Sequence, residues 1–213
     1  HHLFVTHEHT DHILGVVWMV RMIGQLINKG KYPGNLQIYC HEGLTDTILT
    51  LCQLTLVKKV TKLMGERILL VPVKDGEKKV ILEHEITFFN FFSTKAVQFG
   101  FRLGLDNGKV LVCAGDEPYN PVCEPYVQGA DWLLHEAFCL YRDRERVQPY
   151  EKHHSTVKEA CMLAKELGAE NLVLWHTEDT DLAERKTAYG EEGRMYYDGN
   201  LIVPDDGEVI LLN

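Results

Sequence analysis

The stretch THEHTDHILG, residues 6–15, limits what this chain can fold into more than any other part of it. It holds His7, His9, Asp11 and His12 in the pattern HxHxDH, directly before apolar residues with helical spacing. Imidazole nitrogens and carboxylate oxygens are ligands that zinc and several other divalent metals prefer. On an extended strand end the first two histidines share a face, and the turn into a helix points the next two side chains elsewhere. The pattern therefore indicates a strand-to-helix junction that can serve two adjacent metals, with a solvated histidine-rich turn as the plainer alternative.

Apolar runs with strand spacing alternate with runs of helical spacing along the chain. Strands are expected at 3–7, 36–40, 68–73, 85–92, 99–105, 109–115, 132–138 and 171–176, and a C-terminal hairpin around 205–207. Helices are expected at 12–28, 44–64 and 155–167, the last with Ser155 as its N-cap. The residues Asp106-Asn107-Gly108 are a hairpin signal between two of the strands. Paired sheets with helices outside them predict an α/β fold in a single domain of residues 1–213.

The composition excludes several classes of protein. A net charge of −9 does not attract nucleic acid over a long range, so an RNA substrate would need a local basic patch or a metal. The six cysteines are widely spaced and form no CxxC pair, which fits buried thiols in a reducing cytoplasm better than a secreted disulfide framework. No stretch reaches the ~18 apolar residues that a membrane helix needs, so no membrane partner is expected.

Other polar residues stand where the predicted strands end. Asp116 follows an apolar strand that ends in Ala-Gly, and His176 ends the strand NLVLW as His7 ends LFVT. Taken alone, Asp116 is explained equally well as a turn or cap residue, and His176 as a strand-end histidine in solvent. His135 lies inside an apolar strand, where a histidine is usually a satisfied core residue. His154 immediately precedes the expected helix N-cap.

The motifs HxHxDH, the strand-end GD, HEAF, HST and the strand-end VLWH follow one another in this order. This order resembles the metallo-β-lactamase superfamily and, within it, the ribonuclease Z-like branch. The resemblance implies a four-layer αββα sandwich of two mixed β-sheets with outer helices, and metals at one edge of the two sheets. Such folds carry one or two β-hairpins before HxHxDH, so the N-terminal strands are expected to be missing from this chain.

The resemblance also implies roles for individual residues. It implies a two-metal centre whose ligands would be His7 and His9 for the first metal, Asp11, His12 and His176 for the second, and Asp116 as a bridge between them. A water between the metals, its pKa lowered by them, would be the nucleophile. The catalytic set would be Asp11, Glu136 and His154, with His154 as proton donor to the leaving oxygen and His135 supporting the site. Zinc is the expected metal, one or two ions per chain, with Mn²⁺ or Fe²⁺ as alternatives.

The chain departs from the family pattern at three places. The first metal normally has a third histidine, and here Phe92 or Thr94 stands where it is expected. His84 lies too far upstream to replace it; His41 is a candidate, although a surface loop residue is the simpler explanation. A tight hairpin occupies the region in which classical ribonuclease Z enzymes often carry a long tRNA-binding arm. Finally, HTEDTD, residues 176–181, puts acids where they would repel a phosphate backbone.

Three functions remain open. The first is a metal-dependent phosphodiesterase that uses a metal-bound hydroxide on a small phosphodiester or an RNA 3′ end, with Lys152 or the run Arg142, Arg144 and Arg146 as cationic contacts. That arginine run alternates with acids, which favours a solvated face. The second is a hydrolase of a thioester or lactone, and the third is a degenerate metal-binding relative with weak activity. A homodimer is common among such relatives, and β-lactam hydrolysis is not expected.

Overall fold

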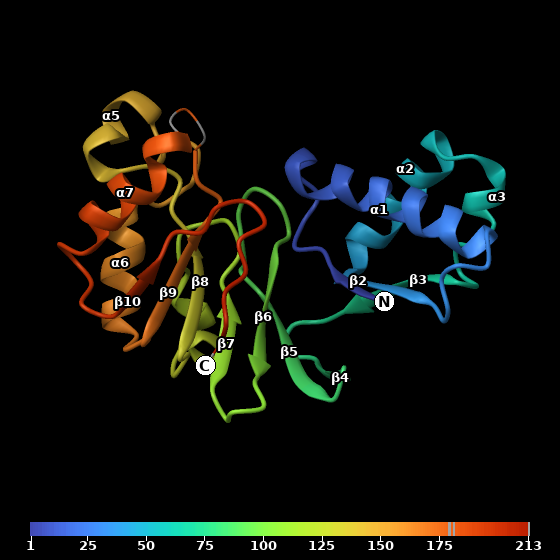
Figure 1. The fold of residues 1–213 in the computed structure, drawn as a ribbon, viewed down its shortest axis with the longest axis horizontal. Helices are drawn as coiled ribbons and strands as arrows, with labels where there is room; N and C mark the ends of the chain where they lie inside the picture. Colours follow the sequence, from blue (N-terminus) through green and yellow to red (C-terminus); the bar gives the residue numbers. More distant parts are fainter. Residues whose placement is uncertain (179, 181, 213) are drawn as a thin grey trace. The chain divides into compact units, whose positions relative to one another are not determined.

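The computed structural model describes residues 1–178, 180 and 182–212, which form two compact units. Unit 1 contains residues 1–77 and 92–99, and unit 2 contains residues 78–91 and those from 100 onward. Each unit holds one sheet with its own helices; unit 1 carries the blue and teal segments of Figure 1 and unit 2 most of the green to red ones.

Unit 1 is built on a three-stranded sheet in the order β1-β2-β3, with strands β1 (His2–Phe4), β2 (Leu36–His41) and β3 (Ile68–Val73). Both strand pairs are parallel. Parallel neighbours need a crossover connection, which α1 (Thr10–Asn28) supplies before β2, and α2 (Glu42–Thr55) and α3 (Lys58–Thr61) before β3. Two mixed sheets were expected. This small sheet is purely parallel, and the sheet of unit 2, described below, is the mixed one.

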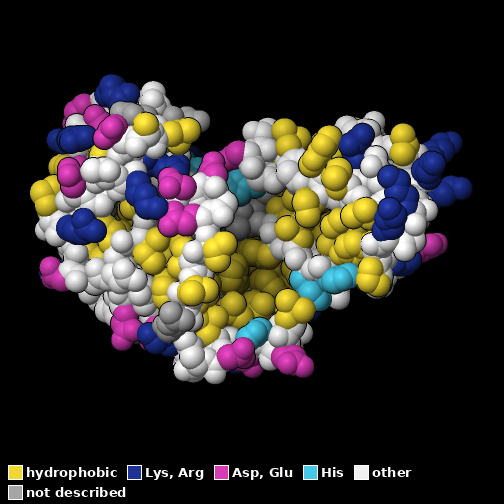
Figure 2. Space-filling view, in the orientation of Figure 1, with side chains coloured by type: hydrophobic (Ala, Val, Ile, Leu, Met, Phe, Trp, Pro, Cys, Tyr) yellow, Lys and Arg dark blue, Asp and Glu magenta, His cyan; other side chains and the backbone are white. Residues whose placement is uncertain are grey.

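Helix α1 carries apolar side chains on two faces. Ile13, Val16 and Val20 are buried at helical spacing and belong to the core of unit 1. A second row at intervals of four residues is exposed, formed by Leu14, Trp18, Met22 and Leu26. Figure 2 shows hydrophobic side chains at the surface of unit 1 where α1 lies. The helix is therefore apolar beyond what burial in its own unit requires.

The single helix expected at 44–64 is wrong, because the chain leaves the helical conformation at Leu56 and Val57. Both residues are extended, with ψ of 153° and 148°, and they separate α2 from α3. The change of direction brings Val60 of α3 onto α1, where its Cγ1 lies 2.7 Å from the place that a Cβ of Gly24 would occupy. The lack of a side chain at Gly24 is what allows this close approach, and tertiary packing overrides the local helical preference.

Unit 2 is built on a seven-stranded sheet in the order β10-β9-β8-β7-β6-β5-β4. Its strands in chain order are β4 (Lys78–Ile81), β5 (His84–Asn90), β6 (Phe99–Gly104), β7 (Val110–Cys113), β8 (Trp132–Glu136), β9 (Asn171–Trp175) and β10 (Asn200–Ile202). Strands β7 to β10 are parallel, and the pairs β6-β7 and β4-β5 are antiparallel. The hairpin predicted between β6 and β7 is confirmed, whereas β4 was not expected from the sequence.

Side chains alternate across this sheet and divide its core in two. Leu133 and Leu172 face a cluster that includes residues of α6 (Val157–Glu166) and α7 (Leu182–Gly193), the helices beside β8 to β10 in Figure 1. Trp132 and Val173 belong to a second cluster. The shorter helices are α4 (Glu124–Val127), α5 (Arg144–Val147) and two 3₁₀ turns, Pro121–Cys123 and Tyr141–Asp143.

Two boundary predictions in unit 2 are wrong. The N-cap of α6 is Thr156 and not Ser155, because Thr156 forms a reciprocal capping box with Glu159. No strand forms at 208–212 in the described part of the chain; β10 instead pairs in parallel with β9, and Ile210 packs on the second cluster. Helix α7 was not expected. Among the described residues, none of the helices combines the length and the apolar character that crossing a membrane requires.

Candidate metal centre

His7 and His9 in unit 1 bring two ring nitrogens together. Nε2 of His7 lies 2.8 Å from Nδ1 of His9, and the two rings meet edge to face. Two nitrogens that bind one tetrahedral zinc ion at about 2.0–2.1 Å lie about 3.3 Å apart, so a separation change of about 0.5 Å would convert this contact into shared coordination. The pair therefore fits a single metal ion.

His7 is held in place by its other ring nitrogen. Its side chain is 1% exposed, and Nδ1 lies 2.9 Å from the hydroxyl of Thr6 and 3.2 Å from the amide nitrogen of Gln98. Metal-ligating histidines are usually oriented in this way by a polar group on the second nitrogen. Sequence reasoning missed both supporting residues. The available signal for Gln98 was a polar side chain between Val97 and Phe99 in an otherwise apolar segment.

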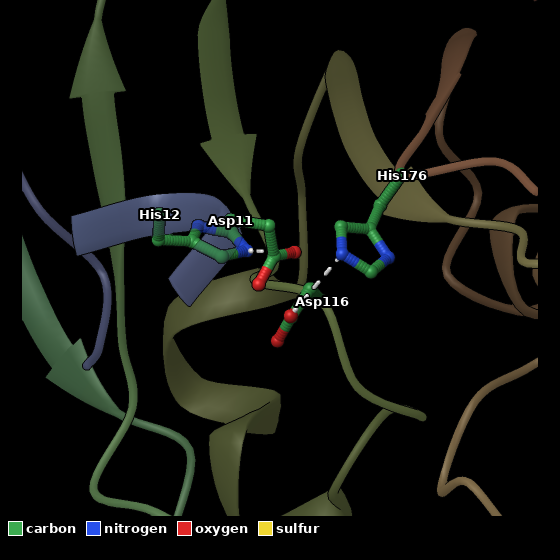
Figure 3. Close-up of side chains that lie close together, drawn as sticks. All are labelled: Asp11, His12, Asp116 and His176. Carbon is green, nitrogen blue, oxygen red and sulfur yellow. Dashed lines mark ion pairs between the residues drawn. The ribbon is translucent and has the colours of Figure 1, made fainter. Parts of the chain in front are cut away.

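Asp11 and His12 lie in the first turn of α1, immediately after the two ligand-type histidines. His12 Nε2 lies 3.4 Å from Asp11 Oδ2, the contact drawn as a dashed line in Figure 3. The position of Asp11 near the helix N-terminus favours its negative charge. The ring of His12 lies 4.2 Å from that of His7, between centroids, and its Nδ1 lies 3.2 Å from the Thr6 hydroxyl. The structure therefore gathers all four residues of HxHxDH at the start of one helix.

Asp116 and His176 form the corresponding pair in unit 2. His176 Nε2 lies 3.5 Å from Asp116 Oδ2, the second dashed line in Figure 3, and Asp116 is 4% exposed. Asp116 follows β7, and His176 follows β9. The carboxyl ends of these strands lie at the same edge of the parallel part of the sheet, where α/β folds place ligands. His176 adopts a φ of 51° and Gly115 a φ of 68°; left-handed backbone at a non-glycine residue is uncommon and concentrates at functional sites.

Glu136 and His154 form a second polar pair in unit 2. Glu136 is fully buried at the end of β8, and its Oε2 lies 3.6 Å from His154 Nδ1. The same carboxylate accepts hydrogen bonds from two backbone amides, that of Ser155 on Oε1 and that of Phe138 on Oε2 at 3.1 Å. These amides fix the carboxylate, which in turn faces one nitrogen of the imidazole. The HEAF and HST segments thus meet through their acid and their histidine.

Aromatic stacking links His154 to His176. The ring of His154 stacks on those of Phe138 and His176, at centroid distances of 4.6 Å and 5.1 Å, and the centroids of Phe138 and His176 lie 6.5 Å apart. The ammonium of Lys152 lies 5.0 Å from the centroid of the Phe138 ring, within the range of a cation–π contact. Phe138 received no role in the sequence reasoning, although it is the last residue of HEAF. The candidate proton donor is therefore held against a candidate metal ligand within one unit.

The remaining predicted residues have other surroundings. His135 is 1% exposed, and its Nδ1 lies 2.7 Å from the carbonyl oxygen of Glu136. His41 is not the surface loop residue expected: it ends β2, is buried, and turns its Nε2 to Glu8 at 3.6 Å. Burial lowers the pKa of His41, while Glu8 acts in the opposite direction. His84 lies 3.2 Å from the carbonyl oxygen of Gly104, at the β6–β7 hairpin.

The arginine run RDRER forms local ion pairs, as a solvated face would. Arg142 and Arg146 each lie 3.9 Å from Asp143, and Arg144 lies 3.5 Å from Glu145. The guanidinium of Arg144 also covers the ring of Tyr141. Exposed pairs of this kind contribute little to stability.

A family model described as "Beta-lactamase superfamily domain" matches residues 1–177. The chain belongs to the beta-lactamase superfamily. Among curated proteins, a ribonuclease Z from Halorubrum lacusprofundi is 26% identical over 258 aligned positions, which cover 98% of this chain and 79% of that protein. Other proteins named ribonuclease Z match over shorter stretches, in which this chain spans 19–33% of their length.

Solved structures of this superfamily share the fold. The metallo-beta-lactamase fold protein YhfI from Bacillus subtilis superposes with a TM-score of 0.71 at 21% identity, covering 97% of this chain and 76% of that one. The short form of human tRNase Z gives a TM-score of 0.69 at 20% identity, covering all of this chain and 79% of that one. The expected fold class and the ribonuclease Z-like resemblance are thereby confirmed. This superfamily consists of metal-dependent hydrolases, and the donor set of both units, imidazole and carboxylate, suits divalent metals.

Proposed function

We propose that this chain is a metal-dependent hydrolase that cleaves phosphodiester bonds. The observation that carries the proposal is the buried carboxylate of Glu136 facing His154, whose ring stacks on His176. Unit 2 therefore contains both a proton donor that is held in position and a histidine of the kind that binds metals. Hydrolysis of a phosphodiester needs both, because charge must be neutralised on the phosphoryl oxygens and the leaving oxygen must receive a proton.

The proposed metal ligands are the histidines and aspartates that the family resemblance implies. His7 and His9 would hold a first divalent ion, Asp11, His12 and His176 a second one, and Asp116 would bridge them. Support comes from the ligand-type pairs within each unit and from membership of the superfamily. Zinc is the proposed ion, with Mn²⁺ or Fe²⁺ as alternatives. When bound, such ions supply a nucleophile at neutral pH and neutralise charge that develops on the substrate.

His154 gives the proton to the leaving oxygen in this proposal. Its Nδ1 faces Glu136, which leaves Nε2 as the ring nitrogen that can carry a proton toward the substrate. The carboxylate lies behind the imidazole, as an acid does behind a catalytic histidine. The two backbone amides that bind Glu136 keep its charge in place, so it orients His154 without touching the substrate.

The substrate class follows from charge and from the relatives. The ammonium of Lys152 lies over the ring of Phe138, which itself stacks on His154, so a cation belongs to the same aromatic cluster. The net charge of −9 disfavours long nucleic acids, so a small phosphodiester or an RNA 3′ end is the proposed substrate. The ribonuclease Z relatives support the RNA alternative. All six cysteines are free and buried, which supports the proposed cytoplasmic location, and a homodimer remains a prediction for light scattering to test.

A panel of substrates tests this proposal. Metal-loaded protein should hydrolyse bis-nitrophenyl phosphate and a short single-stranded RNA, and should turn over a thioester and a lactone far more slowly. Faster hydrolysis of the thioester or lactone would assign the protein to that class of ester instead. Absence of turnover on every substrate, with metals bound, would indicate a degenerate relative.

A further inference from the structure

A cavity of about 250 Å³ in unit 2 lies beside His154. Its walls include Tyr119, His135, Tyr150 and Leu163. Pockets for drug-sized ligands occupy about 300–1,000 Å³, so this cavity accommodates a group smaller than such a ligand, of the size of one ring system. The proposed mechanism assigns it no role.

His135 offers the cavity a buried hydrogen-bond acceptor. Its Nδ1 lies 2.7 Å from the carbonyl oxygen of Glu136, and a carbonyl can only accept, so Nδ1 carries the hydrogen. In the neutral ring Nε2 then presents a lone pair. Nε2 has no hydrogen-bond partner among the described residues, although the residue is 1% exposed. Because an unpaired buried acceptor costs free energy, this atom marks a position that an N–H or O–H group of a ligand would satisfy.

The two tyrosines offer ring faces. The hydroxyl of Tyr150 is already committed, since it donates to Glu159 Oε1 at 2.9 Å, and burial and this bond together raise the pKa of Tyr150 to about 12. The residue is nevertheless 53% exposed, so its ring remains available. Tyr119 lies on the same cavity, three residues after Asp116. Aromatic rings at the wall of a cavity bind flat ring systems, and any nucleobase has such a face.

We infer that this cavity binds the nucleobase of the nucleoside whose oxygen leaves during hydrolysis, with stacking on Tyr150 and a hydrogen bond from a base N–H to His135 Nε2. The inference rests on the proposed function, because that function makes His154 the donor to the leaving oxygen and so places the departing nucleoside beside it. Adenine, cytosine, guanine and uracil all carry an N–H group, so the cavity selects a base over a plain alkyl group and discriminates weakly among bases.

Direct binding of nucleosides tests the inference without any turnover. Metal-loaded protein of residues 1–213 is titrated with adenosine and with cytidine by calorimetry, and with ribose as the probe that lacks a base. Both nucleosides should bind and ribose should not. Tyr150→Ala should weaken nucleoside binding by roughly 5- to 100-fold, the range found when one base loses its aromatic partner, whereas Tyr150→Phe keeps the ring and should change it less than threefold. Met162→Ala, an equally exposed position on α6 outside the cavity, controls for surface changes.

A second measurement tests the hydrogen bond to His135 Nε2 without a substitution, because a variant at this buried residue can fail to fold. In protein labelled with ¹⁵N-histidine, nucleoside addition should shift the Nε2 resonance of His135, and ribose should leave it unmoved. Equal binding of nucleosides to wild type and Tyr150→Ala, or an unmoved His135 resonance at saturation, would overturn the inference. Hydrolysis of bis-nitrophenyl phosphate is read separately: its presence without nucleoside binding contradicts the base subsite alone, and nucleoside binding without any hydrolysis contradicts the proposed function alone.

Discussion

Glu136 Oε2 lies 3.6 Å from Nδ1 of His154, and the Glu136 side chain has no exposed surface. Burying a carboxylate costs free energy unless polar groups compensate; two backbone amides donate hydrogen bonds to Glu136, and the imidazole of His154 lies beside it. The proposal that His154 donates the proton and that Glu136 orients His154 rests on this contact.

Removing the donor should affect substrates unequally. His154→Ala should lower turnover on a short RNA by about 10²–10⁴-fold, the usual contribution of general acid help, and turnover on bis-nitrophenyl phosphate far less, because nitrophenolate leaves without a proton. Glu136→Gln should show the same inequality with a smaller loss, since it weakens the donor without removing it. His153→Asn, at the exposed neighbouring histidine, is the matched control. Equal losses on both substrates would remove His154 from this role.

The metals should be retained unequally. We expect one ion per chain to be held tightly by Asp11, His12, Asp116 and His176, and the other weakly, because the first site lacks its third histidine. Elemental analysis after dialysis against a mild chelator measures both. Phe92→His should raise retention of the weak ion if Phe92 occupies the position of the lost ligand. A gain with Thr94→His instead would shift the register by two residues, and two equally retained ions in the wild type would contradict the expectation.

Burial at His41 should be visible in its titration. The pKa of His41 is lowered from its usual value of 6.5 by desolvation, and Glu8 partly offsets this. We therefore expect a pKa below 6.5 by NMR, and a further decrease in Glu8→Gln. The sign for stability follows: the unfolded chain binds a proton at higher pH than the folded one, so the contribution of neutral His41 is complete above about pH 6.5 and is lost as pH falls toward the folded pKa. A pKa at or above 6.5 in the wild type would contradict the burial.

Two glycines of one strand should respond differently to alanine. A Cβ at Gly100 would lie 2.4 Å from the carbonyl oxygen of Cys113, 2.7 Å from Phe91 and 2.8 Å from Phe89, whereas no described atom lies within 4 Å of a Cβ at Gly104. Gly100→Ala should lower the free energy of unfolding by about 2–3 kcal/mol, as overpacked cores do. Gly104→Ala should change it by less than about 0.5 kcal/mol. Urea unfolding of both variants measures the difference, and similar values would contradict the packing described around Gly100.

The sequence predicted the parts that depend on local pattern and missed those that depend on packing. HxHxDH was singled out because four ligand-type residues within six positions are improbable by chance, and Asp116 and His176 were added through the order of motifs that resembles the family; their joint role as ligands stays a prediction. The β6–β7 hairpin was found because Asp-Asn-Gly favours one turn. The break at Leu56 was missed because it depends on Val60 meeting Gly24 across two helices. Thr6 and Gln98 were missed because a residue that orients His7 leaves no fixed spacing in the sequence.

Local sequence pattern also failed to predict the N-cap of α6 and the conformation of the C-terminal segment. Ser155 has the chemistry of an N-cap, but Thr156 takes the cap because Glu159 stands three residues after it and completes a reciprocal capping box. The segment around Ile210 has the alternation of a strand and packs against the sheet by its side chains instead. A pattern of apolar residues indicates which side chains are buried, and it does not say which backbone groups pair.

Turnover of bis-nitrophenyl phosphate as a function of bound metal tests the central claim most directly. Chelator-treated protein should be inactive, and turnover should return in proportion to zinc or manganese added back. Asp116→Asn, which removes the proposed bridging charge while keeping the shape of the side chain, should recover at most a small part of the wild-type rate. Full turnover without metal, or an Asp116→Asn variant as active as the wild type, would contradict the account.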